Sequence, residues 1–162
     1  MYDIKSLNIW KASSRKDILK GFNKVLSIDV SIRKEICMDS LMNDVCKEIM
    51  LLVPNMDFME IKKRKNGRFL FPIYINEKLE STDIEALELT VRSSNSLHRA
   101  GYKTIADVVN AIESSEDLKK IRNCGAKSIT EIMEKIFCYQ YRQLDENSKI
   151  RYINKLVDLN RY

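Results

Sequence analysis

Histidine is the scarcest ionisable residue of this 162-residue protein, with His98 as its only copy. A protein with one histidine has few groups that can act as a general base or activate a nucleophile near neutral pH. The four cysteines, Cys37, Cys46, Cys124 and Cys138, form no C-x-x-C pair and have no histidine at ligand spacing. We therefore expect reduced thiols, no metal, no cofactor and no enzymatic activity.

Glycine and proline are also rare, with four and two copies, and long apolar runs are missing. The low content of glycine and proline, together with 44% hydrophobic and 31% charged residues, argues against long disordered segments. No stretch approaches the roughly 18 apolar residues that a membrane span requires. The first residues, MYDIKSLNIWK, lack a signal-peptide core. We expect a folded, cytoplasmic protein that does not enter a membrane.

Positive charge is in modest excess and is unevenly distributed. The formal net charge is +5 and the pI is near 9.0, values that permit a nucleic-acid partner without requiring one. Residues 1–80 hold 15 Lys and Arg against 11 Asp and Glu, whereas residues 81–162 hold 13 against 12. If the second half of the protein binds DNA, a local basic patch must do so.

The protein is expected to form two small modules, residues 1–78 and residues 79–162. The boundary is placed there because residues 76–83 are polar and have no apolar periodicity. In the first module, apolar residues at helical spacing predict a helix near 15–26. Alternating apolar residues then predict a strand over 26–32, although an extended lead-in to the next helix fits the same pattern.

A further helix and a β-hairpin are expected before the boundary. Helical spacing of apolar residues predicts a helix from about residue 40 to Val53, before Pro54. The β-prone segments 58–63 and 68–75 flank an Asn-Gly pair, which is the strongest short hairpin signal because both residues tolerate positive φ. Pro72 would restrict the second strand to a sheet edge. The first module is thus predicted to be α+β with a β-hairpin.

The second module is predicted to be all-α and to resemble a helix-hairpin-helix arrangement of short helices. Thr104 and Asp107 have the spacing of a capping box, and Gly125 is expected to take the left-handed conformation that ends a helix. Helices are expected from Val91 to about Arg99, after Thr104, after Ser114, from about Ala126, and from about Asn147 to Asp158. The overall fold class is therefore α+β.

The turn before the fourth of these helices has the residues of a phosphate site. A helix start presents unpaired backbone N–H groups and a partial positive charge to an anion. Gly125 would let a DNA backbone approach closely, Lys127 adds a full positive charge, and Ser128 adds a hydroxyl donor. The same turn also suits an ordinary connection between two helices.

A polar stripe on the helix from Val91 is a second candidate site. Arg92, Asn95, Ser96 and Arg99 follow the i, i+3, i+4, i+7 spacing, so they share one face. Donors of this kind suit the minor groove of A·T pairs, where only acceptors are displayed and where narrow grooves attract arginine. From spacing alone, a solvated helix face is the better explanation.

The segments LELTVRSSNSL (87–97) and LKKIRNCGAKSITEI (118–132) together resemble the C-terminal domain of the bacterial RNA polymerase alpha subunit. The resemblance covers about residues 84–138. It implies a DNA face, which here comprises Arg92, Asn95, Gly125, Lys127 and Ser128. Ser96 stands where relatives commonly have a small Cys. Glu88 and Glu131 match acidic positions through which relatives touch sigma factor, an activator or the edge of the DNA.

The resemblance implies a bacterial, transcription-associated protein that binds the A·T-rich minor groove of double-stranded DNA with its second module. The first module is then expected to bind a partner or to form a homodimer, with RNA polymerase, sigma factor or a transcription activator as candidate partners. One alternative is a module that binds polymerase, sigma factor or a regulator without binding DNA. Another is a helix-hairpin-helix domain of DNA repair. About eighty residues are too few for the alpha subunit's assembly domain, so we expect an accessory protein.

Overall fold

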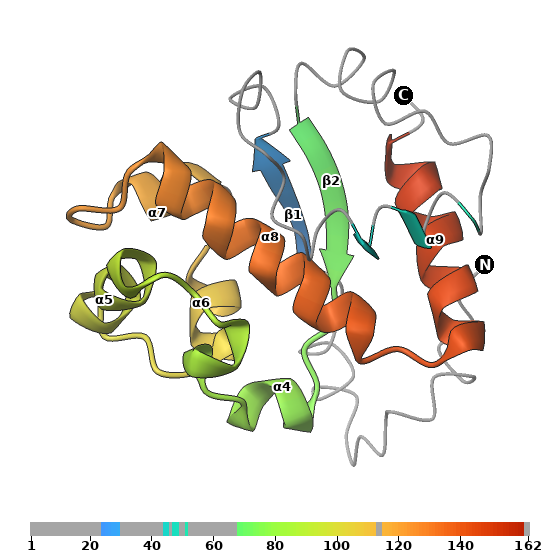
Figure 1. The fold of residues 1–162 in the computed structure, drawn as a ribbon, viewed down its shortest axis with the longest axis horizontal. Coiled ribbons are helices and arrows are strands. Elements are labelled where there is room, and N and C mark those ends of the chain that lie inside the picture. Colours follow the sequence, from blue (N-terminus) through green and yellow to red (C-terminus); the bar gives the residue numbers. More distant parts are fainter. Residues whose placement is uncertain are drawn as a thin grey trace.

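The computed structural model describes residues 24–29, 44–45, 47–48, 51, 68–112 and 115–160. This part of the protein is mostly helical and contains a two-stranded antiparallel sheet (Figure 1). The elements are β1 (Lys24–Asp29), β2 (Arg68–Ile73), α4 (Glu77–Ser81), the 3-10 helix η1 (Ile84–Leu87), α5 (Val91–Arg99), α6 (Ile105–Ala111), α7 (Ser115–Lys119), α8 (Ala126–Arg142) and α9 (Glu146–Asn160). Every helix in these ranges is too short or too polar to span a membrane. The expected combination of helices with a small sheet is thus present.

β1 replaces the end of an expected helix. Leu26 lies opposite Phe71 and Ile28 lies opposite Phe69 in the antiparallel register. Leu26 and Ile28 are fully buried, whereas Val25 on the other face is 38% exposed, which is the alternation of a half-buried strand. The predicted helix near 15–26 is therefore wrong at residues 24–26, because pairing with β2 outweighs the local helical spacing. The predicted strand over 26–32 is correct for residues 26–29.

β2 confirms the expected strand over 68–75, but its described partner is β1 and not the preceding segment. The expected strand 58–63 and its Asn-Gly turn lie outside the described residues. Pro72 is buried in β2 opposite Val25. Its carbonyl accepts hydrogen bonds from Gln140 Nε2 and from the Tyr152 hydroxyl, both at 2.9 Å. Pro72 therefore links β2 to both long helices.

Side-chain amides from α8 and α9 pair with the backbone of β2. Gln140 accepts from the Tyr74 N–H at 2.8 Å and donates to the Pro72 carbonyl. Asn160 accepts from the Leu70 N–H at 2.9 Å and donates to the Leu70 carbonyl at 2.7 Å. Each side-chain amide thus accepts one backbone hydrogen bond and donates another, as the backbone of a neighbouring strand would. Both amides satisfy backbone N–H and carbonyl groups that would otherwise need another partner.

The core lies between the sheet and the two long helices. Figure 1 shows α8 crossing the molecule and α9 standing beside β2. Phe137 of α8 contacts Phe71 with ring centroids 5.3 Å apart and Phe69 at 5.8 Å, both edge-on. Tyr141 and Tyr152 are fully buried beside it. Burial of such large rings supplies much of the apolar stabilisation here.

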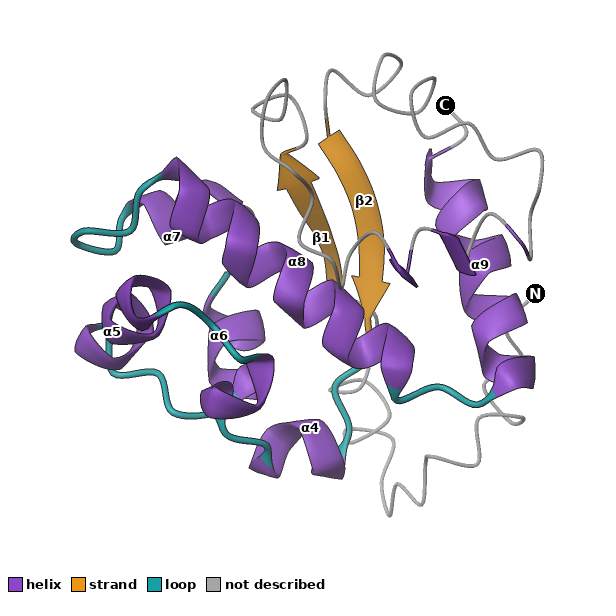
Figure 2. Cartoon of the chain, viewed as in Figure 1, coloured by secondary structure: helices purple, strands orange, loops and turns teal. Residues whose placement is uncertain are grey.

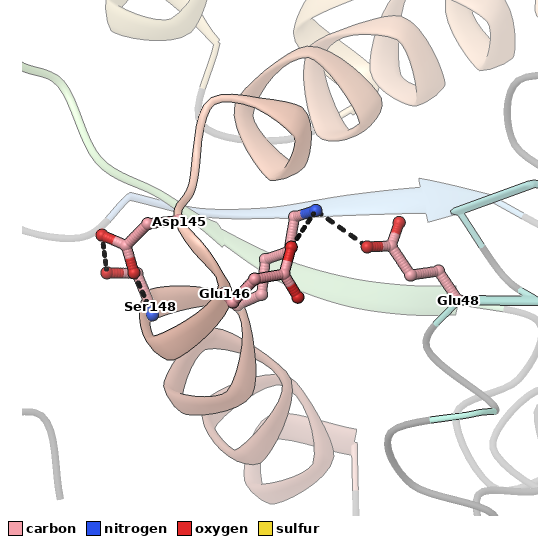
Figure 3. A network of polar contacts seen from close by, with 5 residues as sticks. Glu48, Asp145, Glu146 and Ser148 are labelled. Atoms are coloured by element: carbon pink, nitrogen blue, oxygen red, sulfur yellow. Dashed lines mark hydrogen bonds and ion pairs between the residues drawn. The ribbon is translucent and has the colours of Figure 1, made fainter.

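Lys149 of α9 links that helix to the helical segment around residue 48. Its ammonium lies 2.8 Å from Glu48 and 3.3 Å from Glu146 (Figure 3). The same ammonium lies 5.3 Å from the centre of the Tyr141 ring. The hydrogen bond to Glu48 raises the pKa of Lys149. Burial, with these two carboxylates nearby, raises the pKa of Tyr141. The described residues 44–45, 47–48 and 51 are helical, as expected for the predicted helix from about residue 40 to Val53.

The expected capping box opens α6. Thr104 accepts from the Asp107 N–H at 3.1 Å, and the Asp107 carboxylate accepts from the Thr104 N–H at 2.9 Å. The hydrogen bond from the Thr104 N–H, and a second one from Lys103, hold the pKa of Asp107 below its usual value. An antiparallel bridge between Asp83 and Thr104 ties this loop to the segment before η1. Local sequence therefore predicted this helix start correctly.

The turn between α7 and α8 uses a different left-handed residue from the one expected. Asn123 has φ of 65°, whereas Gly125 has φ of −79° and is the N-cap of α8. The expectation that Gly125 takes the left-handed conformation is thus wrong. Asn tolerates that region better than most residues, so it frees Gly125 for the extended cap position.

α9 spans Glu146–Asn160, slightly longer than the expected helix over 147–158. Ile153 and Leu156 are fully buried as predicted, but Ile150 is 47% exposed. The helix packs against β2, so the last helix contacts the expected first module. The division at residues 78 and 79 stays a prediction, and side-chain packing continues across it.

Candidate nucleic-acid interface

The predicted DNA-contacting residues come from two elements at the same end of the molecule. α5 contacts α8, and the loop between α7 and α8 lies beside them, away from α9 (Figure 2). The start of α8 therefore faces the same end as α5, although the two segments are more than twenty-five residues apart in sequence. Tertiary packing thus combines the two candidate sites into one surface.

Arg92 and Gly125 adjoin each other. The nearest atom to a Cβ built on Gly125 is Nη2 of Arg92, at 3.9 Å. The side chain of Arg92 is exposed, as is Gly125. The same guanidinium acts on Cys124, where burial raises the pKa of the thiol and the positive charge of Arg92 partly offsets that increase. The guanidinium therefore lies directly over the turn that leads into α8.

Asn95 and Lys127 complete the exposed part of this surface. Asn95 follows Arg92 by one helical turn, so the two side chains share a face of α5. Lys127 is the second residue of α8 and is exposed. The combination presents a guanidinium, an amide and an ammonium to solvent, all of which donate hydrogen bonds.

The N-cap of α8 is Gly125, which has no side chain to cap the first N–H groups of the helix. The first N–H groups of any helix have no acceptor within the helix, and the dipole places partial positive charge there. Gly125, Ala126 and Lys127 are all exposed. The helix start can therefore accept an anion from solvent.

Two predicted serines are turned inward. Ser96 is 2% exposed, and its hydroxyl lies 3.0 Å from the Arg92 carbonyl and 3.4 Å from the Asn123 carbonyl. Ser128 is 4% exposed. Their contact with DNA stays a prediction. In the structure, Ser96 connects α5 to the turn before α8, and this contact helps to hold Arg92 beside Gly125.

Glu131 holds the first turn of α5 from outside that helix. Its carboxylate accepts from the Thr90 N–H at 2.6 Å, from the Thr90 hydroxyl at 2.8 Å and from the Ser93 hydroxyl. Thr90 is the N-cap by position, but its hydroxyl makes no capping hydrogen bond to its own helix. A carboxylate at a helix start also interacts favourably with the positive end of the helix dipole. Glu131 therefore fixes the start of α5 onto α8 through residues on both sides of Arg92.

Glu88, the other acidic position of the prediction, is different. It is exposed, ends η1 and has φ of 50°. Sequence reasoning grouped it with Glu131 and missed the partners Thr90 and Ser93. The only signal in the sequence was the hydroxyl content of the segment around Thr90, and it does not indicate a carboxylate 41 residues away.

Part of the sequence is similar to known proteins. Residues 75–137 match the family model for the C-terminal domain of the alpha subunit of bacterial RNA polymerase. The DNA-directed RNA polymerase subunit alpha of Heliobacterium modesticaldum is 38% identical over 96 residues, 59% of this chain and 28% of the relative. The same subunit of Mycoplasmopsis pulmonis is 36% identical over 84 residues, 52% of this chain and 23% of the relative.

A third relative, the alpha subunit of Mesomycoplasma hyopneumoniae, is 45% identical over 67 residues, which are 41% of this chain and 20% of the relative. The protein thus spans about a quarter of the length of the curated relatives it matches. No solved structure matches it. The match begins at residue 75, earlier than expected, and so includes α4. The resemblance expected from Arg92, Asn95 and the turn at Gly125 is confirmed: residues 75–137 resemble the C-terminal domain of the bacterial RNA polymerase alpha subunit.

Proposed function

We propose that this protein is a transcription-associated, non-enzymatic DNA-binding protein. The single observation that supports this most is the position of the Arg92 guanidinium over Gly125, beside the uncapped start of α8. An arginine at that place reaches into a groove while the helix start holds the adjoining backbone. The family match over residues 75–137 supports the same proposal.

The minor groove of A·T-rich DNA is the proposed target of Arg92 and Asn95. A·T pairs display only acceptors in the minor groove, and both side chains supply donors. A narrow A-tract groove concentrates negative potential and attracts arginine. Lys127 and the N–H groups at the start of α8 would bind phosphate, which fixes position and carries no sequence information.

The N-terminal part is proposed to supply a partner contact or self-association. RNA polymerase, sigma factor, a transcription activator or a second copy are the candidate partners. A single small DNA-binding module gives modest affinity, so a tether or a dimer raises its effective concentration. Helix α9 lies beside β2, away from α5 and from the turn that leads into α8 (Figure 1), so a partner bound to α9 would leave the proposed DNA face accessible.

A protein-interaction module that does not bind DNA is the second candidate. It is favoured by the nearly balanced charge of residues 81–162 and by the exposed carboxylate of Glu88. It gives no role to the exposed pair of Arg92 and Lys127. DNA binding is therefore the preferred proposal.

The test is fluorescence anisotropy on an A-tract duplex and a G·C-rich duplex of equal length across a salt series. The variant is Arg92→Ala, and the matched control is Arg142→Ala, which removes an exposed arginine at the far end of α8. We expect the wild type to prefer the A-tract, the control to retain that preference and Arg92→Ala to lose it. Wild-type protein that binds neither duplex at low salt would exclude the proposal and favour the interaction module.

A further inference from the structure

A surface hollow of about 430 Å³ lies next to the proposed DNA face. It is formed by the end of α5, the end of α6 and the segment from α7 into the turn. The lining residues are Arg99, Ala100, Tyr102, Ala111, Asp117, Lys120, Ile121 and Arg122. Three of the eight are basic and one is acidic, so the hollow has an excess of positive charge.

The charges in the hollow are not equivalent. Lys120 lies 2.7 Å from Asp117, so these two largely neutralise each other. Arg99 and Arg122 are both exposed, and within the described residues neither guanidinium forms an ion pair. Two arginines that form no ion pair within the described residues, one from α5 and one from the segment after α7, therefore line one concave site. Planar guanidinium groups bind the oxygens of phosphate and carboxylate in pairs.

Two residues of the hollow follow or precede residues of the DNA face in sequence. Arg99 follows Asn95 by one turn of α5, and Arg122 precedes the turn that contains Asn123 and Gly125. The Ser96 hydroxyl contacts the Asn123 carbonyl and so holds these two walls together. Phosphates follow one another about every 3.4 Å along the axis of each DNA strand. A strand held at the start of α8 would therefore bring its next phosphates toward this hollow.

We infer that the hollow bounded by Arg99, Tyr102 and Arg122 binds a phosphate group, supplied by the DNA backbone next to the phosphate held at the start of α8. This inference rests on the proposed DNA binding and extends it by a second anchoring point. The volume is at the lower end of ligand pockets, which span roughly 300–1,000 Å³, and leaves room for part of the adjoining sugar. The position of Arg122 beside the turn that leads into α8 favours nucleic acid over an acidic peptide.

The main test uses a double variant that carries both Arg99→Gln and Arg122→Gln. Its affinity for each duplex is measured across the salt series and compared with that of the wild type. Each phosphate contact that is lost reduces the slope of log affinity against log salt by about 0.9, so we expect a reduction of about 1 for the one phosphate in the hollow. The loss should be equal for the A-tract and the G·C-rich duplex, because phosphate contacts carry no sequence information. Thermal unfolding of the variant checks that it is folded.

Two further variants serve as controls. Arg142→Gln with Lys155→Gln removes the same charge from α8 and α9 and should retain the wild-type slope. Arg99→Lys with Arg122→Lys keeps the charge and should retain most of it. If the Arg99→Gln, Arg122→Gln variant keeps the wild-type salt slope, DNA is not the source of the phosphate, whatever Arg92→Ala does to the A-tract preference.

A second arm tests free phosphate compounds with inorganic pyrophosphate as the probe. The readout is the ring resonances of Tyr102 in ¹H–¹³C NMR spectra. Shifts in the wild type that vanish in the Arg99→Gln, Arg122→Gln variant would support a phosphate site supplied from solution, even if the wild type binds no duplex and the proposed function fails. An unchanged salt slope together with an unresponsive Tyr102 would overturn the inference.

Discussion

Nη2 of Arg92 lies 3.9 Å from the point that a Cβ on Gly125 would occupy, which is ordinary van der Waals contact. Gly125 has φ of −79° and ψ of 170°, a conformation open to any residue. Alanine therefore fits at this position in the free protein. A bound DNA backbone would have to share the same space.

Gly125→Ala is thus predicted to leave the stability almost unchanged and to weaken DNA binding by about tenfold, or about 1.4 kcal/mol. The control is Gly101→Ala, where φ of 86° strains any side chain although nothing lies within 4 Å of its Cβ. That control should lose about 1 kcal/mol of stability and keep its affinity. Urea denaturation and anisotropy measure the two quantities. Equal DNA affinity of Gly125→Ala and the wild type would contradict the close approach at this turn.

The carboxylate of Glu131 gives a second prediction. Glu131→Ala leaves the Thr90 N–H and two hydroxyls without their acceptor, so we expect a loss of about 1–2 kcal/mol in the free energy of unfolding. Glu88→Ala, at an exposed carboxylate, is the matched variant and should change stability by no more than about 0.5 kcal/mol. Chemical denaturation of both variants provides the comparison. Equal stabilities would show that α5 does not depend on Glu131.

Asn160 should stabilise the open side of β2. Asn160→Ala removes the acceptor of the Leu70 N–H and the donor to the Leu70 carbonyl. The expected cost is about 2–3 kcal/mol in the free energy of unfolding. Asn154→Ala, at an exposed position of the same helix, controls for the change in helix propensity. Urea denaturation of both variants measures the two free energies of unfolding. A loss shared by both variants would indicate an effect on α9 alone.

The capping box of α6 predicts a pH dependence. The folded-state pKa of Asp107 is lowered, so its carboxylate adds stability above its ordinary pKa of 3.8, and this contribution is lost as pH falls through the folded value. Asp107→Ala should therefore cost about 1 kcal/mol at pH 7. The difference from wild type should shrink at about pH 2, where both carry little charge at this position. A difference that stays constant between these pH values would show that the charge contributes nothing.

Local signals in the sequence were sufficient for much of the second half of the protein. The Thr104 and Asp107 spacing predicted the start of α6, and the i, i+3 relation predicted the shared face of Arg92 and Asn95. These features depend on residues within one or two helical turns. Short-range geometry determines them, so no knowledge of the fold was needed.

Long-range contacts account for what the sequence did not predict. β1 pairs with β2 across about forty residues, whereas the Asn-Gly signal favours a neighbouring segment. The contact of Glu131 with Thr90 likewise depends on how α5 packs on α8. Burial of Ser96 follows from the same packing. Spacing rules describe one element at a time, so contacts between elements were outside their reach.

Helix α8 forms part of the proposed DNA face at its start and contacts both strands of the sheet. Its 17 residues extend about 25 Å at 1.5 Å per residue, with Gly125 before its first turn and Gln140 in its last. The helix therefore acts as a rigid spacer of fixed length. A ligand at one end and a protein at the other would be held apart by a set distance and a set rotation. Inserting or deleting a single residue in α8 would turn the two ends by about 100° relative to each other.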